Sequence, residues 1–453
     1  MVHPEHSDID NEEDKAMLDR STSNVKPFQM LAAMSWILLW ALGVVSVVFA
    51  EALWFARPAI ARGDLTTIEN HLVRKLHDAT VDRRLGNAAL VLVQANRVVA
   101  ERGFGVANAS TQAPVNPDRT LYQLASVSKA VTAWGVMKLV EEGRLGLDEP
   151  IVRHLKRWRF PGSEAYRDKV TVRHLLSHTA GLDDGLGYGG FLPGEAIQTL
   201  EESLTLTKDT TVGEPRPVRV AREPGKDMSY SGGGYTILQL LIEEVTNRSF
   251  ADYMKVAVLQ PLGMTKASFD LAAIASEGRS QDLATSYDSE LKVHPTRRHT
   301  ATAAVSLYAT PRDLAQFVQA YSRENPVLRQ ETLKEMMMPQ PGTSGSWGLG
   351  QTLFAANDAG GHVVGHAGGS LPGWGATMRV NPATGNGIVL VVSGGRTPVS
   401  RLANDWVYWE TGMVPFDARL DIVRKRIIPA SVAIVAGAIA LVWWKLFRWK
   451  SRL

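Results

Sequence analysis

The sequence predicts an α/β protein, in which an antiparallel sheet is flanked by helices and interrupted by an inserted helical region, with one transmembrane helix at each end. Two segments, 88–106 and 376–394, each have the pattern of strand, turn and strand. Between them the apolar residues recur mostly with helical spacing. This order predicts a sheet built from both ends of one domain, with helices inserted in the middle.

Composition narrows the class of protein. The chain has 453 residues, of which 45% are hydrophobic and 21% charged, which is enough material for a large core. Its 49 basic and 46 acidic side chains give a net charge of +3, and this near balance argues against nucleic acid as a partner. Cysteine is absent, so the chain has no disulfide, no thiolate metal ligand and no cysteine nucleophile.

The first predicted membrane helix follows an acidic tail. Residues 1–27 have little apolar periodicity and are expected to be disordered. Residues 28–50 contain no charged side chain and are long enough to span a bilayer as a helix. A cleaved signal peptide is the alternative, because Ala50-Glu51-Ala52 resembles a small-residue cleavage site. The length of the apolar run and of the preceding tail favours an anchor.

The second predicted membrane helix covers residues 427–444, followed by a basic tail at 445–453. Basic residues lie on both sides of it, as in a short spanning helix with snorkelling ends. An interfacial helix is the alternative, but it would need a charged face, which this run lacks. The two helices bracket one domain, residues 64–420. The distribution of basic residues only mildly favours termini on the cytoplasmic side.

Three segments of that domain have clear helical signals. Residues 127–143 are apolar on most faces and end at Gly143, a usual residue after a helix C-terminus. Residues 234–247 are amphipathic. Thr310 and Pro311 form an N-cap followed by proline in the first turn of a further helix.

A candidate nucleophile lies at the start of the first of these helices, in the stretch LASVSKA. Ser126 and Lys129 are three residues apart and share a helix face, whereas Ser128 points elsewhere. A partly buried lysine has a lowered pKa and accepts the serine proton. The pattern therefore indicates Ser126 as nucleophile, Lys129 as base and Ser128 as a packing or capping residue. Alone it is weak, because Ser23 and Lys26 have the same spacing in the tail.

Two further segments supply the remaining parts of an acyl-transfer site. Tyr230 precedes a glycine-rich turn that opens a helix, where a tyrosine can carry a proton; the alternative is that it only packs on the core. His366-Ala367-Gly368-Gly369 leads towards a strand, and glycines on an edge strand allow a substrate to approach closely. The amides of Ser126 and Gly369 are candidates for an oxyanion hole.

Together, ASVSK, YSGGGY and HAGG, in this order, resemble the serine β-lactamase and penicillin-binding-protein superfamily, in the branch around class C β-lactamases and DD-peptidases. Residues 170–182 and 259–269 also resemble this branch. The resemblance implies a β-lactamase/DD-peptidase-like fold with its site between the sheet and the helical region. It implies Ser126 as the acylated serine, Lys129 as its partner, and Tyr230 as the tyrosine of Y-x-N. His366, Gly368 and Gly369 match the K-T-G region, which contributes to substrate binding and the oxyanion hole.

Two positions depart from the family pattern. Gly232 stands where the motif has Asn, so no side-chain amide is available to a substrate. His366 stands where penicillin-recognising members have Lys, and a mostly neutral imidazole attracts a carboxylate less. Both changes predict weak or absent β-lactam turnover.

The prediction is therefore a membrane-anchored serine hydrolase, acting on an ester, amide or peptide, with a D-amino-acid-containing or cell-wall-related peptide as one version. The alternative is a catalytically degenerate protein that binds or senses a ligand. The resemblance implies the bacterial inner membrane, with the catalytic domain outside. Neither a cofactor nor a metal is expected, since His174 and His178 lack a third ligand.

Overall fold

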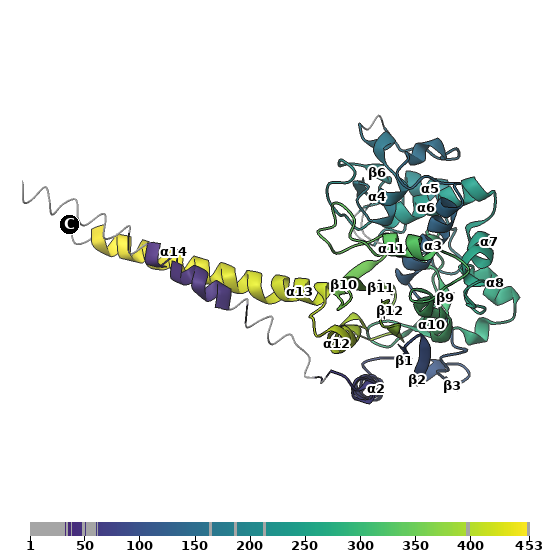
Figure 1. Cartoon of the computed structure of the whole chain (residues 1–453), viewed down its shortest axis with the longest axis horizontal. Coiled ribbons are helices and arrows are strands. Elements are labelled where there is room, and N and C mark those ends of the chain that lie inside the picture. Colours follow the sequence, from purple (N-terminus) through teal and green to yellow (C-terminus); the bar gives the residue numbers. More distant parts are fainter. Residues whose placement is uncertain are drawn as a thin grey trace, which may run out of the picture. The chain divides into compact units, whose positions relative to one another are not determined.

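The computed structural model describes residues 32, 35–37, 39–47, 50, 60, 62–162, 165–184, 188–211, 214–395 and 399–450. The chain forms two compact units. The larger unit comprises residues 59–416, so it ends four residues before the predicted domain limit of 420 (Figure 1). The smaller comprises residues 1–58 and 417–453.

A seven-stranded antiparallel sheet forms the centre of the described part of the larger unit, in the order β10-β11-β12-β13-β1-β2-β3. The early strands are β1 (Asn87–Gln94), β2 (Arg97–Asn108) and β3 (Ala113–Pro114). The late strands are β10 (Thr352–Ala356), β11 (His362–Ser370), β12 (Trp374–Asn381) and β13 (Asn386–Ser393). Pairing of β1 with β13 joins both ends of the domain, as the sequence predicted.

The hairpin between β1 and β2 shows why this segment pairs with itself. Its two turn residues, Ala95 and Asn96, both have positive φ, of 46° and 62°. A two-residue turn of this kind matches the right-handed twist of the flanking strands. Successive side chains of β1 enter two different hydrophobic clusters, because both faces of the sheet are covered.

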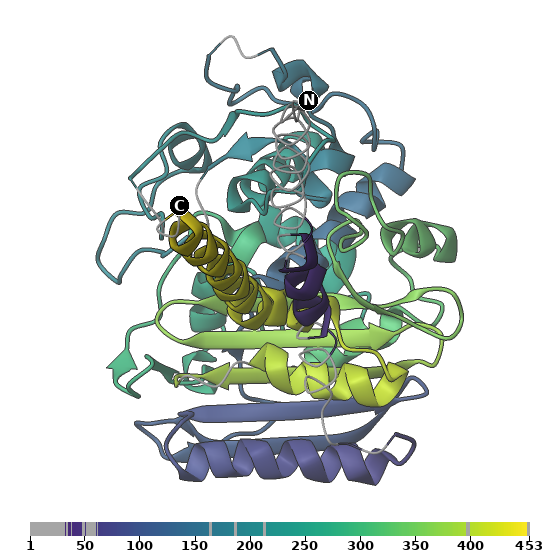
Figure 2. The same cartoon turned by 90° about the vertical axis from the view of Figure 1, so that its left-hand side faces the viewer.

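Helices α2 (Leu65–Val81) and α12 (Val399–Thr411) contact the sheet on one face, in front of it in Figure 2. The first of these was not anticipated from the sequence. Helices α3 (Val127–Glu141) and α10 (Pro311–Ala320) contact the sheet from the other face. The end of α3 agrees with the prediction, since Gly143 follows with a φ of 68°.

The inserted region is mostly helical, as predicted. Its α-helices are α4 (Val172–Leu176), α5 (Leu200–Thr205), α6 (Gly232–Thr246), α7 (Phe250–Met254), α8 (Leu271–Ser276), α9 (Thr302–Val305) and α11 (Gln330–Met336). Short strand pairs tie its loops together: β4 (Tyr122–Gln123) with β9 (Tyr308–Ala309), β5 (Leu182–Asp183) with β6 (Arg219–Val220), and β7 (Ser286–Tyr287) with β8 (Val293–His294). Helices α3 and α6 both contact α9, and this contact positions the site described below.

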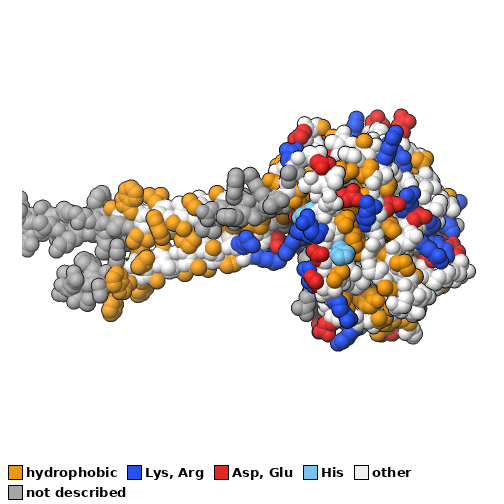
Figure 3. Space-filling view, turned by 90° about the horizontal axis from the view of Figure 1, so that it is seen from below, with side chains coloured by type: hydrophobic (Ala, Val, Ile, Leu, Met, Phe, Trp, Pro, Cys, Tyr) orange, Lys and Arg blue, Asp and Glu red, His pale blue; other side chains and the backbone are white. Residues whose placement is uncertain are grey.

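The described part of the chain contains one helix long and apolar enough to cross a membrane, Phe416–Trp444. It comprises α13 (Phe416–Ile422), a π-helical turn (Val423–Ile427) and most of α14 (Ile428–Lys450). It therefore begins earlier than the predicted residue 427. Figure 3 shows hydrophobic side chains along it, and the exposed ones include Ile428, Val432 and Val435.

The expectation of a span at each end is supported at the C-terminal end alone. In the N-terminal run the structure describes a shorter apolar helix, Ser35–Val47. The predicted acidic tail, residues 28–31, 33, 34, 38, 48 and 49 of the predicted first span, and residues 451–453 of the basic tail lie outside the described residues.

Candidate active site

Ser126 lies at the point where a tight turn becomes helix α3. Ala125 before it has a positive φ of 46°, which is uncommon for a residue other than glycine. Ser126 occupies the N-cap position, but its own φ and ψ of −66° and −9° are helical and its side chain makes no capping hydrogen bond. Its hydroxyl is therefore free of the usual N-cap role.

Lys129 is buried, with 2% of its surface exposed. Its Nζ donates to Ser126 Oγ at 3.1 Å and to the carbonyl oxygen of Ala304, in α9, at 2.8 Å. Burial lowers the pKa of this amine to about 7, and the charge of Asp184 opposes part of that change. Near neutral pH a large fraction of Lys129 is therefore uncharged and able to accept a proton.

Ser128 is fully buried and faces away from this pair. Its hydroxyl oxygen accepts a hydrogen bond from the backbone amide of Leu307 at 2.9 Å. The helix spacing had predicted that Ser126, and not Ser128, shares a helix face with Lys129, because only residues three or four apart share a face.

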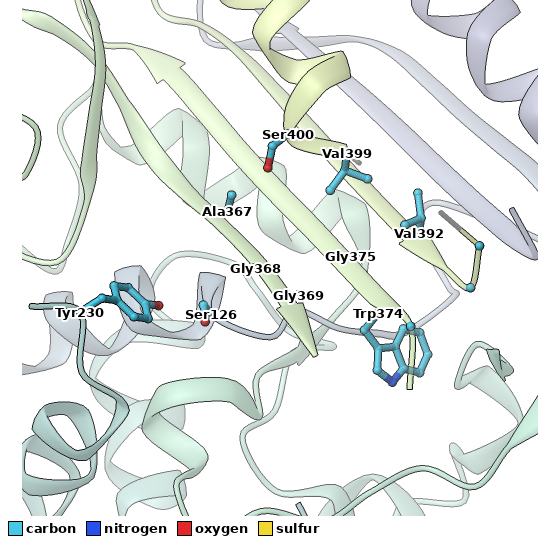
Figure 4. Close-up of a pocket in the computed structure, with 13 residues that line it drawn as sticks. Ser126, Tyr230, Ala367, Gly368, Gly369, Trp374, Gly375, Val392, Val399 and Ser400 are labelled. Atoms are coloured by element: carbon cyan, nitrogen blue, oxygen red, sulfur yellow. The ribbon is translucent and has the colours of Figure 1, made fainter. Parts of the chain in front are cut away.

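Tyr230 lies in the turn before α6, and its hydroxyl is directed towards Ser126 (Figure 4). Burial raises the pKa of this phenol, and an interaction with the Ser126 hydroxyl offsets part of the change. Its ring packs on His178, with 4.3 Å between ring centroids, and lies 5.1 Å from Lys129 Nζ. The phenol is thus neutral near pH 7 and holds a proton close to the serine.

The turn that carries Tyr230 is held by two buried side chains that sequence reasoning did not single out as site residues. His178 Nδ1 accepts a hydrogen bond from the backbone amide of Ser231 at 3.1 Å. Asp184 accepts from the Ser231 hydroxyl at 2.9 Å and from the amide of Gly233. A carboxylate at the N-terminus of α6 is favoured by the helix dipole. No local motif marks these roles, because the partners are about 50 residues apart in sequence.

The HAGG segment forms the second half of β11. Strand β10 pairs with β11 only as far as Gly365, so the part from His366 onward is an edge, as the glycines had suggested. A Cβ atom on Gly368 would lie 2.5 Å from the backbone nitrogen of Ser126. Only glycine permits this approach of the strand to the start of α3. Ser126 and Gly369 consequently line the same cavities.

His366 does not line either described cavity around Ser126. Its side chain is buried against Trp347, 5.3 Å between ring centroids, and lies 6.4 Å from the Tyr230 ring. Its Nδ1 is 2.8 Å from the carbonyl oxygen of Ala367. Burial, with the charge of Lys129, lowers the pKa of His366 to about 3, so the ring is neutral near pH 7. In this position the His366 ring is better placed to support Tyr230 than to contact a substrate directly.

Two cavities meet at Ser126. The larger, about 580 Å³, runs along β11 and β12 and includes Tyr230, Gly368 and Trp374 in its lining (Figure 4). The smaller, about 310 Å³, contains Lys129 and is bounded by Tyr188 and Gly232. The serine therefore has room for a substituent on each side of an attacked carbonyl.

The two histidines of HLLSH do not share a helix face. Helix α4 ends at Leu176, and His178 follows in the left-handed region with a φ of 60°. His174 instead takes part in the N-terminal capping box of α4 with Thr171. Among the described residues no group of three or more potential metal-binding side chains is found.

Comparison with known proteins gives a consistent result. The family described as Beta-lactamase matches residues 70–413. "Protein flp" of Staphylococcus aureus (strain COL) is 23% identical over 336 residues, or 73% of this chain and 62% of that protein. "Penicillin-binding protein 4*" of Bacillus subtilis (strain 168) is 29% identical over 198 residues, 43% of this chain and 41% of that protein.

Among solved structures, the octameric penicillin-binding protein homologue from Pyrococcus abyssi is similar, with a TM-score of 0.61 and 26% identity. The match covers 76% of this chain and 77% of that one. The chain thus spans less than two thirds of the length of the two curated relatives.

Proposed function

The chain belongs to the beta-lactamase family, and we propose that it is a membrane-anchored serine hydrolase that forms an acyl-enzyme on Ser126. The observation that carries the proposal is the contact between Lys129 Nζ and Ser126 Oγ, 3.1 Å, inside a buried environment that lowers the amine's pKa to about 7. A serine hydroxyl is a weak nucleophile until a neighbouring base takes its proton.

In the first half-reaction, neutral Lys129 accepts the proton of Ser126 as Oγ attacks the substrate carbonyl. We propose that the developing oxyanion accepts hydrogen bonds from the backbone amides of Ser126 and Gly369, since both residues line the same cavity. Tyr230 then passes its proton to the leaving group, which departs as an alcohol or amine, and Lys129 replaces that proton on Tyr230 with the one it took from Ser126.

In the second half-reaction, water attacks the acyl-enzyme. Neutral Lys129 and Tyr230 take up the proton that the attacking water loses and pass it to Ser126 Oγ as the acyl bond breaks, so that Ser126 is released with a free acid as product. Lys129, Tyr230 and the two amides are the only groups this sequence of steps requires.

The recognition side of the site supports a substrate other than a penicillin. Gly232 offers no side-chain amide, and His366 is buried and neutral, so neither supplies the polar or charged contacts of penicillin-recognising relatives. We therefore assign an ester, amide or peptide as substrate. A D-amino-acid-containing or cell-wall-related peptide is one version of this substrate.

The apolar helix Phe416–Trp444 supports anchoring in a bilayer. Basic residues flank its apolar part, with Arg424, Lys425 and Arg426 on one side and Lys445 on the other. Such residues favour the two lipid headgroup regions. We propose the bacterial inner membrane, with the catalytic domain outside.

A protein with a degenerate site that binds or senses a ligand is the competing function, and a fluorophosphonate probe separates the two. We expect covalent labelling of the wild-type protein and complete loss of labelling in Ser126→Ala. Ser128→Ala is the matched control, because its hydroxyl faces Leu307, and it should still be labelled. No labelling of folded wild-type protein would favour the binding protein.

A further inference from the structure

The missing asparagine at position 232 has a structural counterpart in Tyr188. A Cβ atom built on Gly232 would lie 2.5 Å from Cε2, 3.0 Å from Cδ2 and 3.4 Å from Cζ of the Tyr188 ring. A side chain of any size at position 232 therefore cannot coexist with this ring position. The phenol occupies the space into which such a side chain would project.

Tyr188 is held in this position and is not a mobile surface residue. Its side chain is 5% exposed. Its hydroxyl oxygen accepts a hydrogen bond from Thr236 Oγ1 at 3.2 Å, and Thr236 lies one turn after Gly232 on α6. The ring is thereby tied to the same helix that it covers at Gly232.

The ring forms part of the wall of the smaller cavity beside Ser126 and Lys129. Val305 and Leu371 add apolar groups to that wall, and Thr211 and Ser370 add neutral polar ones. Among the described lining residues Lys129 supplies the only cationic group, and its amine already contacts Ser126 and Ala304. The cavity therefore suits an uncharged, largely apolar group of limited size.

We propose that Tyr188 determines acyl specificity: its ring closes the smaller cavity and selects substrates with a small, uncharged, apolar acyl group. The inference rests on the proposed hydrolase function and names the substrate class of that same site. The proposal also explains why position 232 is glycine: a residue without a side chain leaves room for the Tyr188 ring.

The acyl portion, not the leaving group, is assigned to this cavity. The acyl group stays attached to Ser126 Oγ from the first half-reaction until water releases it, and of the two cavities lined by Ser126 only the smaller is also lined by Lys129. The leaving group must depart and be replaced by water. The larger cavity, of about 580 Å³, has the room for both.

The test compares two ester series on the full-length protein. In one series the acyl chain grows from acetyl to octanoyl on a constant p-nitrophenyl leaving group; in the other the alcohol grows on a constant acetyl group. We expect the kcat/KM of the wild-type protein to fall steeply with acyl length. In Tyr188→Ala the octanoyl-to-acetyl ratio of kcat/KM should rise by about tenfold or more, since one methylene group in a pocket changes rates by about 10- to 200-fold. The alcohol series should respond equally in both proteins.

Two variants keep the test decisive. Tyr188→Phe retains the ring and should retain the wild-type acyl preference, although it loses the contact with Thr236. Tyr166→Ala removes a tyrosine that lines neither cavity and should leave both series unchanged. If Tyr188→Ala is folded by circular dichroism and keeps the wild-type acyl profile, or if it alters the alcohol series instead, the assignment is overturned.

A second measurement covers the case in which Tyr188→Ala does not fold. Gly232→Asn alone should lower the Tm and the rate of Ser126 labelling, because its side chain collides with the ring. Tyr188→Leu combined with Gly232→Asn should recover part of both losses, a non-additive result expected of residues in contact. Strict additivity would overturn the proposed pairing.

Failure of this inference is distinguishable from failure of the proposed function. Labelling of Ser126 by a fluorophosphonate reports the nucleophile without reference to acyl length. Labelled wild-type protein with an unaltered profile in Tyr188→Ala rejects the role of Tyr188 alone. Absence of labelling rejects the hydrolase and this inference with it.

Discussion

The two sides of the Ser126 site differ in how they are built. On the α3 side, Lys129 has two hydrogen bonds with defined partners, and its amine is buried next to the serine. On the α6 and β11 side, Gly232 has no side chain, and His366 is buried, neutral and outside the described cavities around Ser126. The residues proposed for bond making are thus all present, whereas the two positions that differ from penicillin-recognising relatives lie on the other side. The difference indicates a hydrolase of altered specificity more than a degenerate one.

Removal of the base tests this comparison most severely. Lys129→Met keeps an apolar stem of similar length but cannot accept the Ser126 proton. We expect kcat/KM for a short-chain p-nitrophenyl ester to fall by about 10²–10⁴-fold, the usual range for a general base. If kcat/KM of a folded Lys129→Met variant fell by less than threefold, the α3 side would not supply the base.

A comparison of ester and β-lactam turnover by the wild-type protein tests the recognition side. We expect nitrocefin hydrolysis to be at least about 100-fold slower than that of the best ester, because the substrate lacks its polar and charged partners. The measurement is a pair of kcat/KM values on the same preparation, with Ser126→Ala as background. Rapid nitrocefin turnover would contradict the assignment of altered specificity.

Tyr230→Phe examines the group that links the two sides. The variant keeps the ring packed on His178 but removes the proton that faces Ser126. Loss of this proton carrier should reduce kcat by about 100-fold. Because the loss arises from leaving-group protonation, it should be smaller for p-nitrophenyl esters, whose leaving group needs no proton, than for amides. Equal losses for both would argue for a structural role.

The pH dependence of kcat/KM should report Lys129. The amine acts in its neutral form, so the rate should rise with pH through about 7, where its pKa lies. The charge of Asp184 raises that pKa, and Asp184→Asn should therefore move the rising limb to lower pH. Asparagine retains an oxygen that can accept from Gly233, which limits the effect on α6. An unchanged or alkaline-shifted limb would mean that another group controls the rate.

The smallest effect on activity is expected for Ser128→Ala. Its loss leaves the amide of Leu307 without a partner in a buried place, which costs about 1–3 kcal/mol of stability. Denaturant unfolding should show this loss, whereas fluorophosphonate labelling of the folded protein should match that of the wild type. If Ser128→Ala lost labelling without losing stability, Ser128 and not Ser126 would be the nucleophile.

Sequence patterns predicted the sheet well, because its strands are marked by local signals. The hairpin turn at Ala95 and Asn96 and the β12–β13 turn are encoded within a few residues. Helix α2 was missed, and the N-terminal membrane span was expected but only a shorter helix, Ser35–Val47, is described there.

In the candidate site, local spacing was sufficient to distinguish Ser126 from Ser128, since the distinction depends only on the helix repeat. His366 is different. Its family position suggested contact with a substrate, but it packs behind Tyr230 against Trp347. Neither neighbour is near it in sequence, so no pattern along the chain predicts that burial.

By itself the sequence determined which chemical groups the protein has: a serine and a lysine one helical turn apart, a tyrosine before a glycine-rich helix start, and a glycine strand that follows. These depend on spacing, backbone freedom and side-chain chemistry, which are properties of short segments. Only the tertiary structure decided how those groups meet. Packing of the fold buries Lys129, which lowers the pKa of its amine, and it also positions the Tyr188 ring in the space beside Gly232. Burial and close approach depend on residues far apart in the chain, and the fold alone brings these together.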